Sequence, residues 1–430
     1  MKRIFAIAFI ACFGAATAFA DISFGGSLAG SWKVLEDGAG DDLITSFGPI
    51  ANSVRGRFNI DAVNEAGTFG GWMQFRIQQG PALLTSVWWK PFSSLKATYG
   101  YMWGGGNPIG VALADDDFIP IKFYGRSANY IPWGYEVLTG AHIEFTLQNL
   151  YIIASVPLDN SGNLSFNGWG TPYKVGTAEK AEDIFKHTMG RIAYTIPNVG
   201  ALRLTVAGGT GDVTSSVINY YTVDVVPDVS LGSVDATVFD VGFALNALGA
   251  LKLDLGVEIP LAGKTWLTAN SGVDVEAQIP IAVNLRADVS SGAFKFAGGV
   301  SGKFGGKSEV TDNNNKVSTL FEQGAVIGVT LNPAVDLGIL TAGVVGEVEY
   351  NMEDSYTIGD KGYAYDARLN WNVAPYIQKE VLTGGTVYIG FQISSNLKKI
   401  EFDHENLDKW DSGFKSGVDW SIPIGFSYSF

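Results

Sequence analysis

The chain has one cysteine and three histidines, and no long apolar run follows its first twenty residues. Cys12 lies in an N-terminal segment that we expect to be removed, which excludes disulfides, thiolate metal sites and a cysteine nucleophile. Because no later stretch is apolar over eighteen residues, a helical membrane protein is excluded. His142, His187 and His404 lack metal-ligand spacing and a recognisable Ser/Asp setting, so we predict no metal, no cofactor and no enzyme.

The N-terminus has the layout of a secretory signal peptide. A positively charged start and an apolar run precede Ala18-Phe19-Ala20, which offers a small-x-small cleavage site. We therefore expect a signal peptide over residues 1–20 and a mature protein over residues 21–430. A short N-terminal membrane anchor and a lipid anchor at Cys12 are the minor alternatives, since the run is short for a spanning helix.

Charge is scarce and mainly acidic. Charged residues make up 17% of the chain, and removal of Lys2 and Arg3 leaves 27 basic against 43 acidic side chains, a net charge of −16. This balance argues against a nucleic-acid partner and fits acidic loops exposed to the outside medium. No Pro/Ser-rich linker divides the chain, so a single large β structure is expected despite its length.

Apolar and polar residues alternate along many segments, which is typical of strands with one dry face and one wet face. From Val273 to Val289 every odd position is apolar, and residues 251–259, 363–373 and 386–393 repeat the pattern. A barrel of many strands has a lumen too wide for side chains to fill. The polar face must then point inward, and the apolar face requires lipid outside.

Tight turns alternate with long polar or Gly-rich connections, as short periplasmic turns alternate with long external loops. Tight turns are predicted at 64–67, 197–200, 290–292 and Asn332-Pro333-Ala334. With both termini on the periplasmic side we count about 18 strands, with about 16 as the alternative. Residues 134–157 fit either one long strand or two shorter ones. The sequence thus predicts an all-β transmembrane antiparallel β-barrel of about 16–18 strands.

The chain ends on a two-faced segment. Its apolar face comprises Trp420, Ile422, Ile424, Phe426, Tyr428 and Phe430, and small residues with Pro423 occupy the other face. A terminal Phe with Tyr two residues before it resembles the assembly signal of bacterial outer-membrane barrels. The resemblance implies that Ile422, Ile424, Phe426, Tyr428 and Phe430 direct the chain to the barrel assembly machinery and into outer-membrane lipid. The alternative is a buried edge strand of a secreted sandwich.

The first predicted hairpin gathers basic residues on one face. A turn centre between residues 65 and 66 makes paired positions sum to 131, which sets Arg55 against Arg76 and Arg57 against Gln74. Like charges placed directly opposite destabilise a strand pair, so these arginines need water or an anionic partner. We predict that they line a pore, together with further inner-wall bases at Lys96, Arg191 and Arg203.

An acidic triplet, Asp115-Asp116-Asp117, lies in the long connection 103–134. This layout resembles general bacterial porins, in which a basic ladder on the wall faces an acidic loop folded into the pore. The resemblance implies a constriction loop, a transverse field that orients solutes, and a homotrimer. The Pro-Glu-Phe-Gly-Gly motif of that loop is absent here. Solvated wall arginines and an exposed loop tip are the alternative interpretation.

These features favour a channel for passive diffusion of small hydrophilic solutes and ions. A plugged active transporter is disfavoured, because strand-like sequence begins at about Ile22. A surface adhesin or antigen and a transporter of hydrophobic substrates remain the alternative functions.

Overall fold

The structure is a computed structural model. It describes residues 19–37, 43–47, 55–77, 81–101, 139–157, 163–165, 172–174, 188–212, 233–261, 264–265, 274–278, 281–305, 307–311, 317–322, 324–358, 361–365, 367–399 and 414–430. The expected signal peptide lies outside these ranges except for Phe19 and Ala20, which begin the first strand. None of the described residues forms a helix of the length and apolar character needed to cross a membrane.

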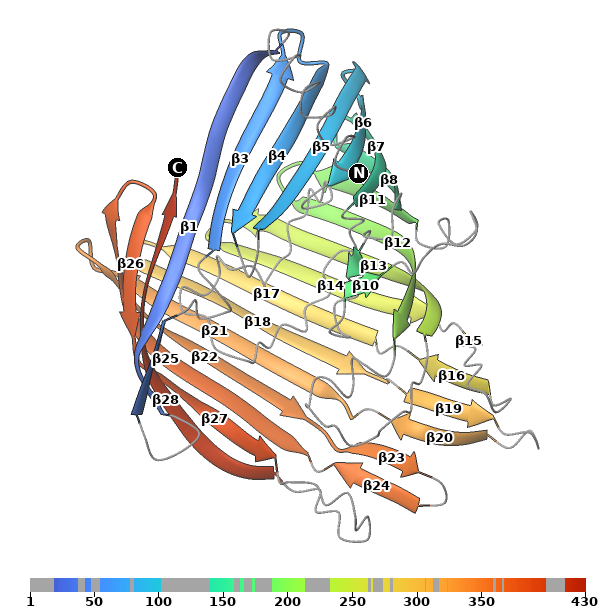
Figure 1. The fold of residues 1–430 in the computed structure, drawn as a ribbon, viewed down its shortest axis with the longest axis vertical. Helices are drawn as coiled ribbons and strands as arrows, with labels where there is room; N and C mark the ends of the chain where they lie inside the picture. The colour runs from blue at the N-terminus through green and yellow to red at the C-terminus, as the bar shows by residue number, and fades with distance from the viewer. Residues whose placement is uncertain are drawn as a thin grey trace.

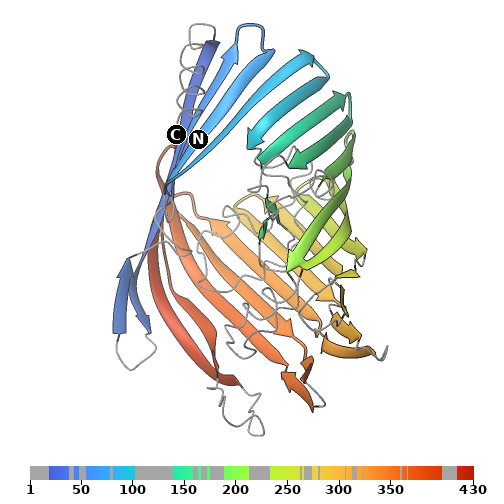
Figure 2. The same cartoon turned by 45° about the vertical axis from the view of Figure 1, so that its right-hand side comes forward.

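The chain folds into a closed antiparallel barrel of 18 strands (Figures 1 and 2). Each barrel strand pairs with its neighbours along the chain, and β28 returns to β1. In wall order the strands are β1 (Phe19–Asp37), β3 (Arg55–Asn64), β4 (Phe69–Ile77), β5 (Pro81–Phe92), β6 (Leu95–Tyr101), β7 (Thr139–Leu147), β8 (Leu150–Pro157), β11 (Met189–Ile196), β12 (Gly200–Asp212), β13 (Ser233–Leu248), β14 (Leu251–Leu261), β17 (Ile281–Ser291), β18 (Phe294–Phe304), β21 (Val326–Asp336), β22 (Thr341–Asn351), β25 (Arg368–Leu382), β26 (Gly385–Gly390) with β27 (Gln392–Lys399), and β28 (Phe414–Ser429).

Two positions of the wall are each filled by two short strands. β2 (Leu43–Phe47) pairs with the second half of β1, and β3 pairs with the first half. β26 and β27 keep one continuous register against β25 and are interrupted at Phe391. Phe391 stands opposite Pro375, whose ring nitrogen has no hydrogen to donate to the ladder. The count of 18 therefore confirms the larger of the two predicted numbers, and residues 134–157 supply two strands, β7 and β8.

The seam between the first and last strands is closed by the chain terminus. Phe430 donates its backbone N–H to the Gly26 carbonyl at 3.0 Å, and Gly26 donates to the Phe430 carbonyl at 2.8 Å. A Cβ on Gly26 would lie 2.4 Å from the Arg57 carbonyl oxygen and 2.7 Å from the Phe430 ring. Only glycine fits there without a shift of backbone. Among the described barrel strands, closure pairs the last strand with the first, as hydrocarbon surroundings require.

The first hairpin differs from the predicted register by two residues. Its pairs sum to 133, so Arg57 stands opposite Arg76 and Asn59 opposite Gln74. The predicted pairings of Arg55 with Arg76 and of Arg57 with Gln74 are both wrong. The turn is longer than assumed, because Asn64 Oδ1 accepts hydrogen bonds from the backbone of Thr68 and Phe69 at 2.8 and 3.0 Å. Since the shift is even, every side chain stays on its predicted face.

One predicted turn is a strand. Asn332-Pro333-Ala334 lies inside β21, and the turn falls at residues 337–340. There Gly338 has a φ of 80°, which glycine tolerates, and its N–H donates to Asp336 Oδ1 at 2.9 Å. Pro333 was mistaken for a turn residue because proline is common in turns. It is accommodated opposite Phe296, where the β21–β22 pairing is interrupted.

Part of the wall continues beyond the barrel. β15 (Lys264–Thr265), β16 (Asp274–Gln278), β19 (Lys307–Thr311), β20 (Val317–Glu322), β23 (Asp354–Ile358) and β24 (Lys361–Tyr365) form a six-stranded sheet. Each follows or precedes a barrel strand between β14 and β25, so three hairpins extend the wall (Figure 1). They rise at the end opposite the tight turns, which is the expected external side.

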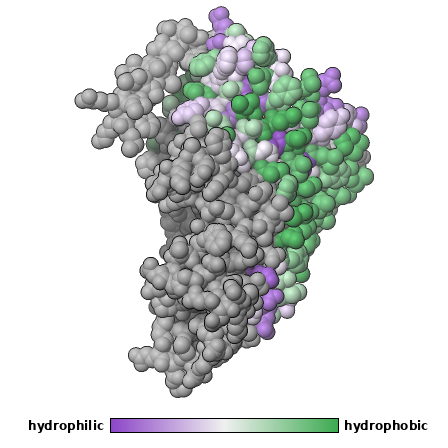
Figure 3. Space-filling view, turned by 90° about the vertical axis from the view of Figure 1, so that its right-hand side faces the viewer, coloured by the Kyte–Doolittle hydropathy of each residue, from purple (hydrophilic) through white to green (hydrophobic). Residues whose placement is uncertain are grey.

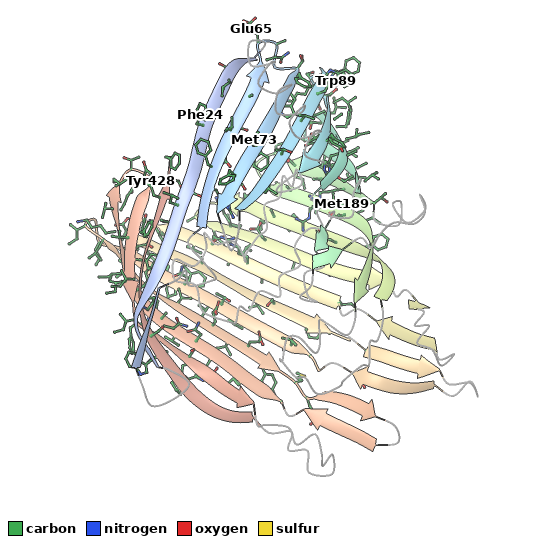
Figure 4. The ribbon with its side chains drawn as sticks, in the orientation of Figure 1. Phe24, Glu65, Met73, Trp89, Met189 and Tyr428 are labelled. Atoms are coloured by element: carbon green, nitrogen blue, oxygen red, sulfur yellow. The ribbon has the colours of Figure 1, made fainter. Side chains whose placement is uncertain are left out.

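The outward face of the wall is apolar, as the alternation predicts. Leu255, Leu285, Val373 and Ile389 occupy the predicted odd positions and are exposed. Figure 3 shows part of this belt, bordered by hydrophilic residues at its upper edge. Exposed aromatic residues cluster near the tight-turn end, as at a membrane interface, and these include Phe69, Trp89, Phe92, Tyr194, Phe294 and Phe430. Figure 4 shows Trp89 near the Glu65 turn.

Candidate pore lining

The inner face carries polar side chains where a soluble barrel would carry its core. Arg57 points away from the exposed ring of Phe58, onto the inner wall, and is half-buried. One row nearer the turn, Gln74 Nε2 donates to Asn59 Oδ1 at 2.6 Å across the same strand pair. Arg76 and Arg55 are placed by backbone alone: Arg76 stands opposite Arg57, and Arg55 pairs with Ala29 of β1.

Lys96 holds an acidic partner on the next strand. Its ammonium Nζ lies 2.8 Å from Glu144 Oε2, and the two residues are directly opposite in the β6–β7 pair. The Tyr151 hydroxyl of β8 donates to Glu144 Oε1 at 3.0 Å, so one carboxylate joins three strands. Lys96 is therefore part of an ion pair as well as of the inner wall.

Arg191 and Arg203 lie side by side on β11 and β12 and are almost fully buried. Arg203 Nη2 lies 3.0 and 2.9 Å from the two carboxylate oxygens of Asp240 on β13, and both side chains have 0% exposure. Arg191 Nε donates to Thr205 Oγ1 at 3.0 Å. A Cβ on Gly242 would lie 3.1 Å from the Arg203 guanidinium, so this glycine leaves room for it.

Further around the wall, Arg286 and Asp288 of β17 form an ion pair at 2.6 Å. Asp254 of β14 stands directly opposite Arg286 in the register. The charged side chains on β6 to β17 form three ion pairs and include Arg191, which donates to Thr205. We call this band the charge ladder: Lys96, Glu144, Arg191, Arg203, Asp240, Arg286 and Asp288. Polar side chains buried in this way need partners, and the ladder supplies them.

Sequence reasoning missed two groups on the inner wall. His142 is 1% exposed, and its Nδ1 lies 2.9 Å from Ser155 Oγ, a contact that no sequence pattern indicates. The register brings the two together across β7 and β8. Glu347 and Glu349 of β22 lie buried beside Asn372 of β25. The alternation of apolar and polar residues predicts that both glutamates face the lumen, but only the strand register shows that Asn372 lies beside them.

Other predicted residues lie elsewhere. Asp115, Asp116 and Asp117 fall outside the described residues, together with most of the predicted constriction loop. A different connection contributes a short hairpin, in which β9 (Asn163–Ser165) pairs with β10 (Pro172–Lys174). β10 contacts β12 and is drawn within the outline of the barrel in both views (Figures 1 and 2). This hairpin comes from the connection between β8 and β11.

The C-terminal strand has the predicted two faces. Ile424, Phe426 and Phe430 are exposed on the outer side, and Ser421, Pro423 and Gly425 are buried on the inner side. The rings of Tyr428 and Phe430 stack at 5.7 Å. Pro423 is paired within the sheet rather than at an edge, and β1 bulges opposite it between Lys33 and Leu35. The bulge accommodates the missing N–H of proline.

Closure into 18 strands, an apolar outer belt and a charged inner wall define the class: a multi-pass outer-membrane β-barrel with porin-like architecture. No protein-family model and no curated protein matches the sequence. Among solved structures, OccK2 of Pseudomonas aeruginosa aligns with a TM-score of 0.50 at 10% identity, covering 96% of this chain and 98% of that one. At that identity the likeness concerns the fold alone.

Two further outer-membrane structures align over nearly the whole chain. OmpF of Salmonella typhi, in complex with daunomycin, has a TM-score of 0.45 at 9% identity and covers 95% of this chain and 97% of its own. The trimer form of OmpT of Vibrio cholerae has a TM-score of 0.44 at 12% identity, with 95% and 99% covered.

Proposed function

We propose that the protein is a porin-like channel for the passive diffusion of small hydrophilic solutes and ions. The observation that carries this proposal is the charged and polar inner wall of a closed 18-stranded barrel. Barrels of about 16–18 strands are wide enough to leave an aqueous passage, and a polar lining keeps that passage wet. A transporter of hydrophobic substrates would need an apolar lumen, whereas the inner face of this barrel carries the charge ladder.

The lining also supports a preference among ions. Ion pairs join Lys96 to Glu144 and Arg203 to Asp240, and the register of β3 and β4 brings Arg57 and Arg76 directly opposite one another. Rings and patches of charge set ion preference and orient dipolar solutes. Removal of residues 1–20, delivery by the barrel assembly machinery through β28, and assembly as a homotrimer belong to the same proposal and rest on the sequence patterns.

Channel conductance tests the proposal directly. Purified protein, refolded in detergent and added to a planar lipid bilayer, is expected to give stepwise increases in current in KCl. The control is the same preparation after heat unfolding, which should give no steps. Folded protein that inserts into the bilayer but conducts no ions would refute the channel.

A further inference from the structure

One described element belongs neither to the barrel wall nor to the six-stranded sheet. Among the described strands, β9 and β10 pair only with each other, and the register of this hairpin sets Tyr173 opposite Leu164. β10 also contacts β12 of the wall. Figures 1 and 2 both draw the hairpin inside the outline of the barrel, so two views and one contact point to a position in the lumen beside β12.

The two faces of the wall behind the hairpin differ sharply in exposure. Ile192 of β11 and Leu204 of β12 stand opposite each other on the outer face and are 48% and 43% exposed. In the adjacent pair on the inner face, Arg191 and Thr205 are 1% and 0% exposed. Neighbours within the sheet surround both pairs alike, and wall side chains do not fill the lumen of a barrel with this many strands. The inner face of β11 and β12 is therefore covered from the lumen side.

Another part of the inner wall keeps more of its exposure. On β3 the inward side chains of Arg57, Asn59 and Asp61 are all half-buried, and so are those of Ser86 and Trp88 on β5. In the wall order β6, β7, β8 and β11 separate β5 from β12, so β3 and β5 face the hairpin from a distant part of the wall. Cover is therefore uneven around the lumen, and it is heavy where β10 makes its contact.

We propose that the β9–β10 hairpin folds over the inner face of β11 and β12 and narrows the pore, so that ions and solutes pass between the hairpin and the wall formed by β3 to β5. This rests on the proposed channel function and adds the segment that limits the size of the solute. Backbone at this depth is tolerated where it is buried against protein or lines water, and the hairpin does both. The ion pair of Arg203 and Asp240 then lies behind the hairpin, outside the ion path, whereas Arg57 borders it.

Thiol labelling of the refolded full chain tests where the hairpin lies. In a Cys12→Ser background, which has no cysteine, Tyr173→Cys on β10 should react with N-ethylmaleimide but only slowly with a polyethylene-glycol maleimide too bulky to enter the barrel. Tyr363→Cys is the matched control, because it makes the same substitution on β24 of the six-stranded sheet and should react quickly with both reagents. Equal rates with the bulky reagent at the two positions would overturn the inference. If Tyr173→Cys fails to refold, Leu164→Cys takes its place, since it stands opposite in the hairpin.

Bilayer recording of the same variants tests the narrowing. Reaction of Tyr173→Cys with a small charged methanethiosulfonate should lower the conductance of each step, because the added group occupies the narrow passage. The same reaction at Tyr363→Cys should leave the steps unchanged. Deletion of residues 163–174 from the full chain should raise the conductance of each step. The narrowing is refuted if either the modification at Tyr173→Cys or the deletion leaves the step size as it was.

The two measurements separate the hairpin from the channel itself. Steps of current that neither the modification nor the deletion alters would refute the narrowing and leave the channel intact. Folded protein that conducts no ions, but whose Tyr173→Cys variant is protected from the bulky reagent alone, would refute the channel and leave the hairpin inside the barrel.

Discussion

At the scale of single residues, buried ion pairs connect neighbouring strands on the inner wall. Arg203 and Asp240 are both fully buried, and each finds its counter-charge within 3.0 Å. Burial makes such a pair sensitive to the loss of one member, because the remaining charge is left in a poorly polarisable environment. An exposed pair is held much more weakly, since water screens it and its side chains lose entropy.

Asp240→Asn should therefore destabilise the barrel strongly. We expect the free energy of unfolding to fall by about 3–5 kcal/mol, as for other buried ion pairs that lose one partner. Urea-induced unfolding in lipid vesicles, followed by tryptophan fluorescence, would measure it. Lys295→Gln is the matched control, because Lys295 and Asp336 are 3.8 Å apart and about half exposed, and it should cost at most about 1 kcal/mol. Equal losses in both variants would contradict this account.

At the scale of strands, β28 has two separate roles. Its backbone closes the seam with β1, and its terminal aromatic ring lies on the outer surface, where Phe430 is 55% exposed. Because about half of the ring is exposed, its contacts with Gly26 and Tyr428 stabilise the barrel less than a fully buried ring would. This placement is consistent with the proposed role of Phe430 in the assembly signal.

Phe430→Ala should therefore impair assembly more than stability. In a bacterium that expresses the full chain, we expect several-fold less folded barrel in the outer membrane, and nearly unchanged urea unfolding of protein refolded in detergent. Phe92→Ala removes a comparably exposed ring beside the β5–β6 turn and serves as the control. If both variants reach the membrane equally, Phe430 has no special part in assembly.

At the scale of the whole molecule, different strands carry different sets of charged side chains on the inner face of the barrel. The charge ladder on β6 to β17 contains three ion pairs, and the register of β3 and β4 sets Arg57 opposite Arg76. The acid pair on β22 lies elsewhere on the wall. In the proposed channel, charged side chains at several places on the wall should make the passage respond to the sign of an ion.

Arg57→Gln combined with Arg76→Gln should shift the ion preference toward cations. The reversal potential of bilayers in a KCl gradient would show this shift, because removal of positive charge lowers the barrier for K⁺ relative to Cl⁻. Lys379→Gln is the control, since Lys379 is exposed on β25 near a tight turn, on the face that carries Ile377. A reversal potential that stays unchanged in the double variant would remove these arginines from the pore lining.

The sequence by itself determined the class of the fold and the face of most strand residues. Alternation has a period of two, so residues such as Leu285 and Val373 face outward whatever the register, and a two-residue slip in the first hairpin left its faces intact. The terminal strand was recognisable for the same reason. The prediction of a turn at Pro333 is wrong, because proline is common in turns but also occurs in strands. Only the pairing of β21 with β18 shows that Pro333 lies within a strand.

The tertiary structure alone decided which side chains meet. Register depends on turn geometry, which in the first hairpin rests on hydrogen bonds to Asn64 that no alternation reveals. Arg203 and Asp240 lie on neighbouring strands joined by a long connection, as do Glu347 and Asn372. A long connection does not fix the register of the two strands, so the sequence does not predict these pairs. Closure of β28 onto β1 joins the two ends of the chain. Faces follow from local geometry, whereas partners follow from the pairing of distant strands.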